Sequence, residues 1–285
     1  MRSQLLSVHR PQLHGHPRRF ERQMLRYRAD ATNPGDLVAW PLSCNGAFEA
    51  SICGAGAASA LDFGNEAWFI QQAAQWGLAL FKVSEEQGGV APIVVDGQTV
   101  NVPRIGPNSL ATPTAWMRAL ALGWLVRDTR VASQLAAIDL AVPNASVSGV
   151  DREAYLRPMT EALAAFELED PSTLGKARRA RELTHPDALE RFVPALMVER
   201  VHGAPLDILI ALASDDADAF SDAVGNAIAG HAAYVIEDER THQHDLLLPW
   251  LVLGLAAKGY DRGWTVQIDS GYFPTWMVVG GSNSP

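Results

Sequence analysis

The stretch at residues 115–138 reads AWMRALALGWLVRDTRVASQLAAI and decides the fold class. Its apolar residues recur three or four positions apart, the spacing that gathers side chains on one face of an α-helix. They form two rows. The first is Trp116, Leu120, Gly123 and Trp124, with Arg127 at its end, and the second is Val131, Leu135 and Ile138. Only residues 127–129 interrupt the pattern, and a break this short is typical of two antiparallel helices. The stretch therefore predicts a helical hairpin.

The same spacing recurs on both sides of this stretch and predicts three more helices. Their rows are Phe69, Ala73, Trp76 and Leu80; Tyr155, Met159, Leu163 and Phe166; and Phe220, Val224, Ile228, His231 and Val235. Pro158 either opens or kinks the second helix. Ser214, Asp215 and Asp216 are the expected capping residues of the third. Residues 246–257 (LLLPWLVLGLAA) predict a buried core helix.

Two segments break the helical pattern. Residues 89–103 read GVAPIVVDGQTVNVP, and Asp96 and Gly97 lie there between β-branched runs, which is a strong signal for a β-hairpin. Residues 264–269 (WTVQID) alternate as a short strand does and are a candidate third strand. The predicted fold class is mostly α, an array of helical hairpins with a small β-hairpin or three-strand element.

Charge divides the chain unevenly. Residues 1–30 contain seven arginines against Glu21 and Asp30, a net charge of +5, whereas the whole 285-residue chain carries −9. Residues 199–245 contain ten acids and only Arg200 and Arg240 to oppose them. No long Pro/Gly/Ser linker divides the chain. We therefore expect a basic arm at 1–30, one mainly helical domain at 31–279 and a frayed tail at 280–285.

Composition excludes several classes of protein. The negative net charge argues against a general nucleic-acid binder. Cys44 and Cys53 are too few for a disulfide framework, and nine helical positions would separate them by over 13 Å, with a rise of about 1.5 Å per residue. The start lacks an apolar signal region, and a twelve-residue apolar run reaches only about 18 Å. We expect a cytoplasmic protein without a membrane span.

The motifs give little support to an enzyme. Residues 54–59 (GAGAAS) resemble a dinucleotide-binding glycine motif, but no strand–helix–strand pattern surrounds them. We interpret these small residues as a place where two helices approach closely. The sequence contains no GxSxG nucleophile elbow and no Walker motif. The chain is therefore predicted to have no catalytic residues and no cofactor.

One cluster has the residue types that bind metal. It comprises His231, Glu237, Asp238, Glu239, His242, His244 and Asp245. The zinc motif HExxH is absent, and His231 falls on the apolar face of its helix, where a hydrogen-bonded core histidine is the usual finding. We predict no bound metal. A solvated acidic face and an interaction surface are the other interpretations, and a metal-dependent enzyme using this cluster is the alternative to test.

One set of residues resembles a known family. Residues 106–109 (GPNS), 115–120 (AWMRAL), Arg127 and Asp128 are similar to the signature of the immunity protein 49 family, the antitoxins of bacterial polymorphic toxin systems. Three further pieces follow in the family's order: residues 155–166, the helix with His231 and Tyr234 together with the apolar helix after it, and residues 265–274. The resemblance spans about residues 65–274, and the arginine-rich start departs from it.

The resemblance implies a stoichiometric inhibitor that binds and neutralises a cognate toxin domain encoded by a neighbouring gene. It carries over no catalytic residue, because such proteins act by binding. It makes Gly106, Pro107, Trp116, Tyr272 and Pro274 scaffold residues that form a turn, a core anchor and a strand exit. It implies no membrane and no direct nucleic-acid partner. A helical scaffold or adaptor protein with another partner is the competing interpretation.

Charge suggests where a toxin would bind. Toxins that attack nucleic acid carry basic clefts, and an acidic inhibitor is steered to such a cleft and can mimic phosphate. The expected surface is the acidic segment of Glu237, Asp238, Glu239 and Asp245, with Tyr234 as an aromatic anchor. The alternative patch is Asp215, Asp216 and Asp218.

Overall fold

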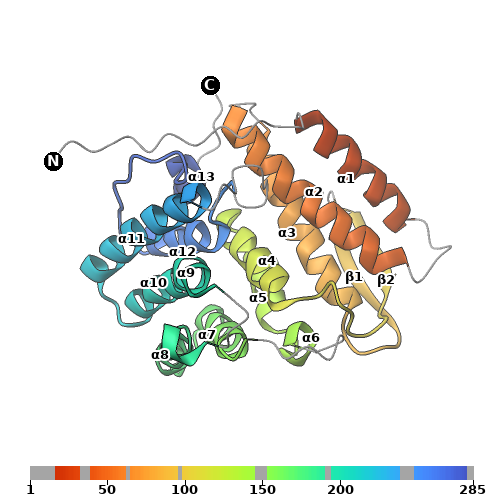
Figure 1. Ribbon diagram of the computed structural model, residues 1–285. Coiled ribbons are helices and arrows are strands. Elements are labelled where there is room, and N and C mark those ends of the chain that lie inside the picture. The colour runs from red at the N-terminus through yellow and green to blue at the C-terminus, as the bar shows by residue number, and fades with distance from the viewer. Residues whose placement is uncertain are drawn as a thin grey trace.

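The computed structural model describes residues 17–32, 39–61, 65–95, 98–144, 153–189, 194–237 and 247–280. Within these ranges the fold is mostly helical with one two-stranded antiparallel sheet, which confirms the predicted fold class. Figure 1 shows α1, α2, α3 and the hairpin on one side, helices α7 to α12 on the other, and α4 between them. No helix in the described part of the chain is long and apolar enough to cross a membrane.

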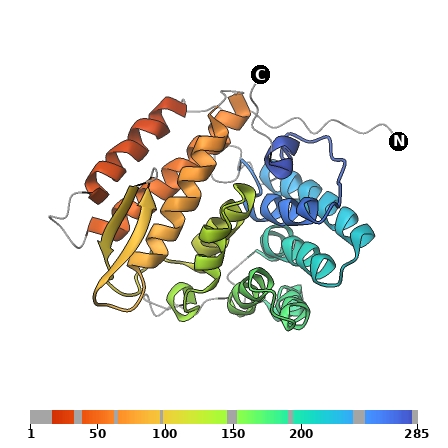
Figure 2. The same cartoon turned by 180° about the vertical axis from the view of Figure 1, so that it is seen from behind.

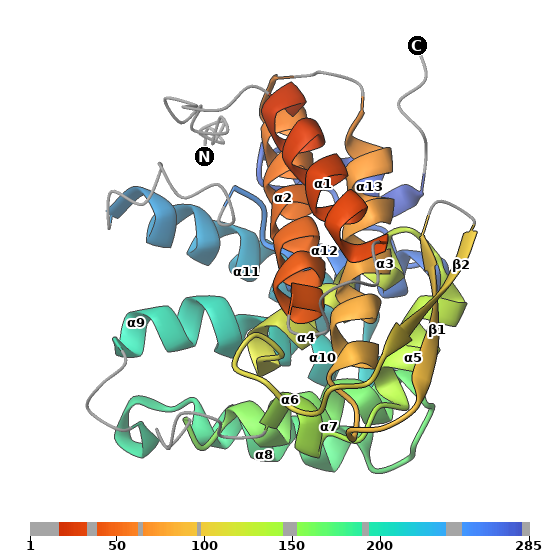
Figure 3. The ribbon, with the colours of Figure 1, turned by 90° about the vertical axis from the view of Figure 1, so that its right-hand side faces the viewer.

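Three helices lie side by side in the first half: α1 (Pro17–Thr32), α2 (Ala39–Leu61) and α3 (Glu66–Val83), as Figure 3 shows. Glycines let α2 approach both neighbours, because a Cβ on Gly54 would lie 2.4 Å from the Phe69 ring and one on Gly46 would lie 2.7 Å from the Tyr27 ring. The interpretation of residues 54–59 as a helix contact is therefore confirmed. Cys44 and Cys53 both lie on α2, and neither is part of a disulfide.

The predicted helical hairpin consists of α4 (Pro113–Leu125) and α5 (Thr129–Ala136). Side chains cap both starts, since the Thr112 hydroxyl accepts from the Ala115 N–H at 3.2 Å and the Asp128 carboxylate accepts from the Val131 N–H at 3.0 Å. The buried Trp116 indole donates to the Leu135 carbonyl at 3.0 Å. Gly123, near the end of α4, lies against Val131 near the start of α5, while Trp116 near the start of α4 meets Leu135 near the end of α5, so the helices run antiparallel.

The β-hairpin is also confirmed. Strand β1 (Val90–Val95) pairs antiparallel with β2 (Gln98–Pro103), in a register that runs from Val90 opposite Pro103 to Val95 opposite Gln98. The turn residues Asp96 and Gly97 lie outside the described residues. The strand β1 packs on α3, and Figure 2 shows the hairpin beside that helix.

The proposed third strand is wrong. Residues 264–269 form no strand, and within the described ranges the sheet has two strands. The alternation is real, because Trp264, Val266 and Ile268 pack against the core while the residues between them are exposed. The Trp264 ring contacts the ring of Phe220 on α11 edge to face, at 5.3 Å between centroids. In residues 264–269, the alternation of apolar and polar residues therefore indicates that one side of the segment is buried. It does not indicate pairing with a neighbouring strand.

The second half of the chain contains the remaining helices, and the rows of apolar residues predicted the longer ones. The elements are α6 (Ala141–Asn144), α7 (Leu156–Glu167), α8 (Thr173–Leu183), a 3₁₀ turn (Pro186–Ala188), α9 (Ala195–Met197), a π-helical turn (Val198–Gly203), α10 (Ala204–Ala213), α11 (Ala217–Glu237), α12 (Trp250–Asp261) and α13 (Thr275–Val279). Pro158 lies in the first turn of α7 and therefore opens that helix. Pro274 precedes α13 instead of ending a strand, so its expected role as a strand exit is corrected.

The helix α4 forms the centre of the molecule. It packs against α3, α5, α7 and α12, and Trp116, Leu120 and Trp124 on it are buried. Its approach to α12 is very close, because a Cβ on Gly254 would lie 2.8 Å from the Cα and carbonyl oxygen of Ala121. The quoted stretch thus organises both halves of the fold.

The basic segment is partly built into the fold. The expected helix around residues 18–28 is confirmed as α1, whose Met24 is fully buried and whose Phe20 and Tyr27 pack against the core. Residues 1–16 and the tail residues 281–285 lie outside the described residues.

We expect deletion of residues 1–16 to lower Tm by no more than a few degrees. Those residues contain few apolar side chains to bury, so little transfer free energy is lost. The contrasting change is Met24→Ala, which we expect to destabilise the fold by about 2–4 kcal/mol because that side chain is fully buried. Thermal unfolding measures both, and a fall beyond about 8 °C on deletion would show that the segment is structural.

Candidate functional site

The acidic segment at the end of α11 is only partly visible. Glu237 is the last residue of α11 and its side chain is not described, while Asp238, Glu239 and Asp245 lie outside the described residues, as do His242 and His244. The placement of a toxin contact on this segment stays a prediction.

Tyr234 belongs to the inner face of α11. Its side chain is 3% exposed, and it follows the buried His231 by three residues, which is close to one helical turn. His231 itself packs edge to face on Tyr272 at 5.3 Å between ring centroids. A surface anchor must be exposed before the partner arrives, and Tyr234 lacks that exposure because it faces the core.

The alternative patch lies at the corner between α10 and α11. Asp215, Asp216 and Asp218 are all exposed there. Asp215 has a left-handed backbone with φ of 56°, and its carboxylate lies 4.0 Å from the guanidinium of Arg262. Asp216 caps α11, because its carboxylate accepts from the Ala219 N–H at 2.9 Å, which confirms one of the three predicted caps.

Sequence reasoning missed one member of this corner. Asp222 is exposed and lies four residues after Asp218, so both side chains are on one face of α11. That spacing was the available signal. We call Asp215, Asp216, Asp218 and Asp222 the acidic corner. Asp215, Asp216 and Asp218 lie at the N-terminus of α11, where the helix dipole favours negative charge, and Asp222 lies one turn further along.

The two acidic regions are far apart. The acidic corner is at the start of α11 and Glu237 is at its end, and the helix has 21 residues. With a rise of about 1.5 Å per residue, the regions are about 30 Å apart. The structure therefore places Glu237 far from the acidic corner.

A cavity of about 260 Å³ lies under the C-terminal half of α11. Its walls come from α4, the π-helical turn, α11 and the start of α12, and two arginines and two histidines line it: Arg118, Arg200, His202 and His231. Burial, and then the positive charge of Arg118, lower the pKa of His202 to about 4, so the His202 imidazole is neutral at pH 7. Sequence reasoning missed this cavity because its lining residues lie up to 138 positions apart, from Thr114 to Val252.

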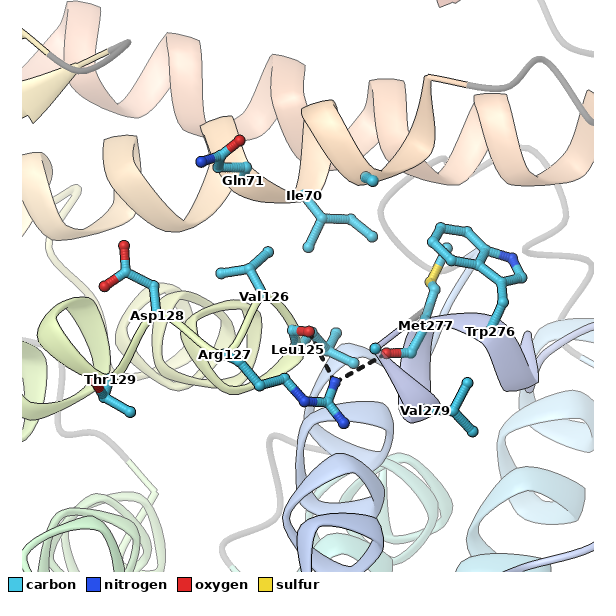
Figure 4. Close-up of a pocket in the computed structure, with 12 residues that line it drawn as sticks. Ile70, Gln71, Leu125, Val126, Arg127, Asp128, Thr129, Trp276, Met277 and Val279 are labelled. Carbon is cyan, nitrogen blue, oxygen red and sulfur yellow. Dashed lines mark hydrogen bonds between the residues drawn. The ribbon is translucent and has the colours of Figure 1, made fainter. Parts of the chain in front are cut away.

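A groove of about 760 Å³ lies between α3, the α4–α5 junction and α13 (Figure 4). Arg127 lies on its wall with a left-handed φ of 53°. Its guanidinium donates to the carbonyls of Leu125 at 2.9 Å and Met277 at 3.2 Å, and to that of Val278, and it pairs with Asp261 at 3.1 Å. The Arg127 guanidinium therefore holds α13 and α12 against the α4–α5 junction.

Metal ligands do not gather in the visible part of the molecule. Among the residues that the structure describes, no group of three His, Cys, Asp or Glu side chains could hold a metal ion. The predicted cluster is represented there by His231 and the backbone of Glu237.

The fold and these sites define a mostly helical protein with exposed acids at a helix corner and a cavity beneath the same helix. A family model described as Immunity protein 49 matches residues 58–277, from α2 to α13, and the chain belongs to this family. This confirms the resemblance. The family consists of immunity proteins, which act on a toxin partner and are generally not enzymes. Searches of curated proteins and of solved structures found no match.

Proposed function

We propose that this protein binds the toxin domain encoded by a neighbouring gene and neutralises it by stoichiometric occlusion in the cytoplasm. The observation that carries the proposal is the family match over residues 58–277, which implies an immunity protein and a toxin partner in general. The setting is a bacterial polymorphic toxin system, in which the producer needs protection from its own toxin.

Charge supports a toxin that acts on nucleic acid. The chain carries a net charge of −9, and the acidic corner is exposed to solvent. A basic substrate cleft attracts such a surface over the Debye length, which is about 8 Å at physiological ionic strength. The proposed contacts are Glu237, Asp238, Glu239 and Asp245 with Tyr234, and the alternative patch is Asp215, Asp216 and Asp218.

Co-expression tests the proposal. The toxin domain from the neighbouring gene is induced in a bacterial host with and without this protein, and growth and complex formation are measured together. We expect growth only in the presence of this protein, and a one-to-one complex after purification. Full toxicity in cells that contain folded protein would contradict the proposal.

The binding surface is tested by charge reversal at each end of α11. One variant carries Glu237→Lys, Asp238→Lys and Glu239→Lys, and the other carries Asp215→Lys, Asp218→Lys and Asp222→Lys, which leaves the Asp216 cap in place. Loss of rim charge acts mainly on the association rate. We expect the variant at the true interface to associate about tenfold more slowly at low ionic strength, with a smaller difference at about 0.5 M salt.

A matched control keeps the change in net charge the same. Glu86→Lys, Glu182→Lys and Asp187→Lys reverse three exposed acids that lie away from α11. Stopped-flow association compares the three variants. Equal slowing in all of them would show a general effect of net charge, and unchanged rates at low salt in both α11 variants would remove the acidic surface from the mechanism.

A further inference from the structure

The outer face of α1 combines positive charge with an exposed apolar side chain. Arg22 and Arg26 are exposed and stand four residues apart, so they lie on one face of the helix, about 6 Å apart along its axis. Both line a surface hollow of about 470 Å³, whose wall also includes Gln23 and Tyr27. Leu25, which is 43% exposed, lies on the same side of the helix. This face can therefore contact both an anion and a hydrocarbon surface.

The core of the protein does not use this face. The helix α1 is anchored by its other side, where Met24 is fully buried and Phe20 packs against the core. Like charges four residues apart destabilise a helix, so Arg22 and Arg26 do not help α1 to form. The family match begins at residue 58, after α1, and gives this helix no role. An exposed pair of arginines is suited to a negatively charged partner.

The helix α11 has a face of the same spacing and the opposite charge. Asp218 and Asp222 are exposed and four residues apart, and Gly225 follows three residues later, with open space where a Cβ would lie. On α1 the two arginines are followed at the same spacing by the exposed Ala29. Each face thus consists of two like charges and then a small residue, and the two faces are complementary in charge.

The two complementary faces lie on opposite sides of the molecule. Figures 1 and 2 show α1 at one side and α11 at the other, with α2, α3 and α4 between them. The faces of one molecule therefore cannot meet each other. A second copy can place its α11 on the α1 of the first copy, and its own α1 then stays open for a third. Contacts between different surfaces of identical chains build rings or open chains.

We propose that copies of this protein associate head to tail, with the Arg22, Leu25 and Arg26 face of α1 from one copy docked on the Asp218 and Asp222 face of α11 from the next. Both ion pairs form at once because the charges on each helix are about 6 Å apart. Exposed ion pairs contribute little, so the association is weak and sensitive to salt. Nucleic acid is less favoured as the partner, since the net charge of −9 repels it. The proposal needs no toxin and is separate from the proposed function.

Charge exchange tests the proposal by sedimentation velocity on the purified protein. One variant carries Arg22→Glu and Arg26→Glu, and the other carries Asp218→Arg and Asp222→Arg. Each pair of changes moves the net charge of −9 by four units, so both variants stay negative. We expect each variant alone to associate at least about tenfold more weakly than the wild type at low ionic strength. An equimolar mixture should associate as the wild type does, because each variant then meets the opposite charge on the other.

A chain with all four substitutions keeps the wild-type net charge and should associate with itself again. The control is Arg178→Glu with Arg179→Glu, which reverses two exposed charges on α8 and should leave the association within about twofold of the wild type. Circular dichroism checks that each variant is folded. A wild type that stays monomeric at low salt, or a mixture that fails to associate, would overturn the proposal. Binding of a short single-stranded DNA that is lost with Arg22→Glu and Arg26→Glu, by a protein that stays monomeric, would assign the face to nucleic acid instead.

Discussion

Replacing Gly254 by alanine is expected to destabilise the protein by about 2–3 kcal/mol, although alanine is the better helix former. The added Cβ would lie 2.8 Å from the Cα and carbonyl oxygen of Ala121, and these are backbone atoms that cannot rotate away. The helices α4 and α12 must separate to accept it, and every contact along their shared face is weakened. Urea denaturation measures the change as a lower midpoint.

Gly225 offers a matched control on α11. A Cβ at Gly225 would meet nothing within 4 Å, so Gly225→Ala gains helix propensity without a clash. We expect this variant to be more stable by about 0.5–1 kcal/mol. The two glycine-to-alanine changes therefore have opposite signs. A gain in stability for both would mean that α4 and α12 are not as closely packed as described.

Arg127→Ala is expected to lower stability by about 2–3 kcal/mol. Its guanidinium bonds three backbone carbonyls, two of which lie in α13, and it pairs with Asp261 of α12. The estimate is below the sum of these bonds because the side chain is 27% exposed and water replaces part of what is lost. We also expect limited proteolysis to cut the α13 region faster in this variant.

Two further substitutions separate the causes. Arg127→Gly removes the same bonds but tolerates φ of 53° without strain, so it should be more stable than Arg127→Ala by about 1 kcal/mol. Arg130→Ala, which removes an exposed arginine 3.5 Å from Asp128, should cost under about 0.5 kcal/mol. If Arg127→Ala were no worse than Arg130→Ala, the role of Arg127 as a clamp on α13 would be wrong.

The helices were predictable because their signal is local. Rows such as Trp116, Leu120 and Trp124 repeat with the period of one helix, and the apolar residues of every predicted row are buried in the structure, whereas Arg127 at the end of the first row is partly exposed. The short break at residues 127–129 also predicted the α4–α5 hairpin. The failure at residues 264–269 has the opposite cause. Strand pairing depends on a distant partner, and alternation alone records only which side of a segment is buried.

The candidate sites were harder to predict because they depend on tertiary structure. Arg118 and Trp250 meet at one cavity from positions 132 residues apart, and no local pattern joins them. The π-helical turn that carries Arg200 and His202 does not follow from any of the apolar rows in the sequence. The acidic corner was predicted from composition, and the i, i+4 spacing of Asp218 and Asp222 extends it. Proximity to the acidic segment suggests a surface role for Tyr234, whereas its spacing of three residues from His231 indicates the inner face, and its side chain is buried.

The length of α11 limits what a partner can cover. An interface of standard size buries about 800 Å² on each protein, which corresponds to a disc about 30 Å across. That diameter equals the length of the 21-residue helix, so one partner reaches both acidic ends only when it is centred on the middle of α11. Exposed Asn226 and Ala229 lie on that central stretch, and such short side chains lose little rotamer freedom when covered. A partner with a smaller contact area covers one end of α11 and leaves the other end in solvent. The length of α11 therefore sets the minimum size of a toxin surface that contacts both ends.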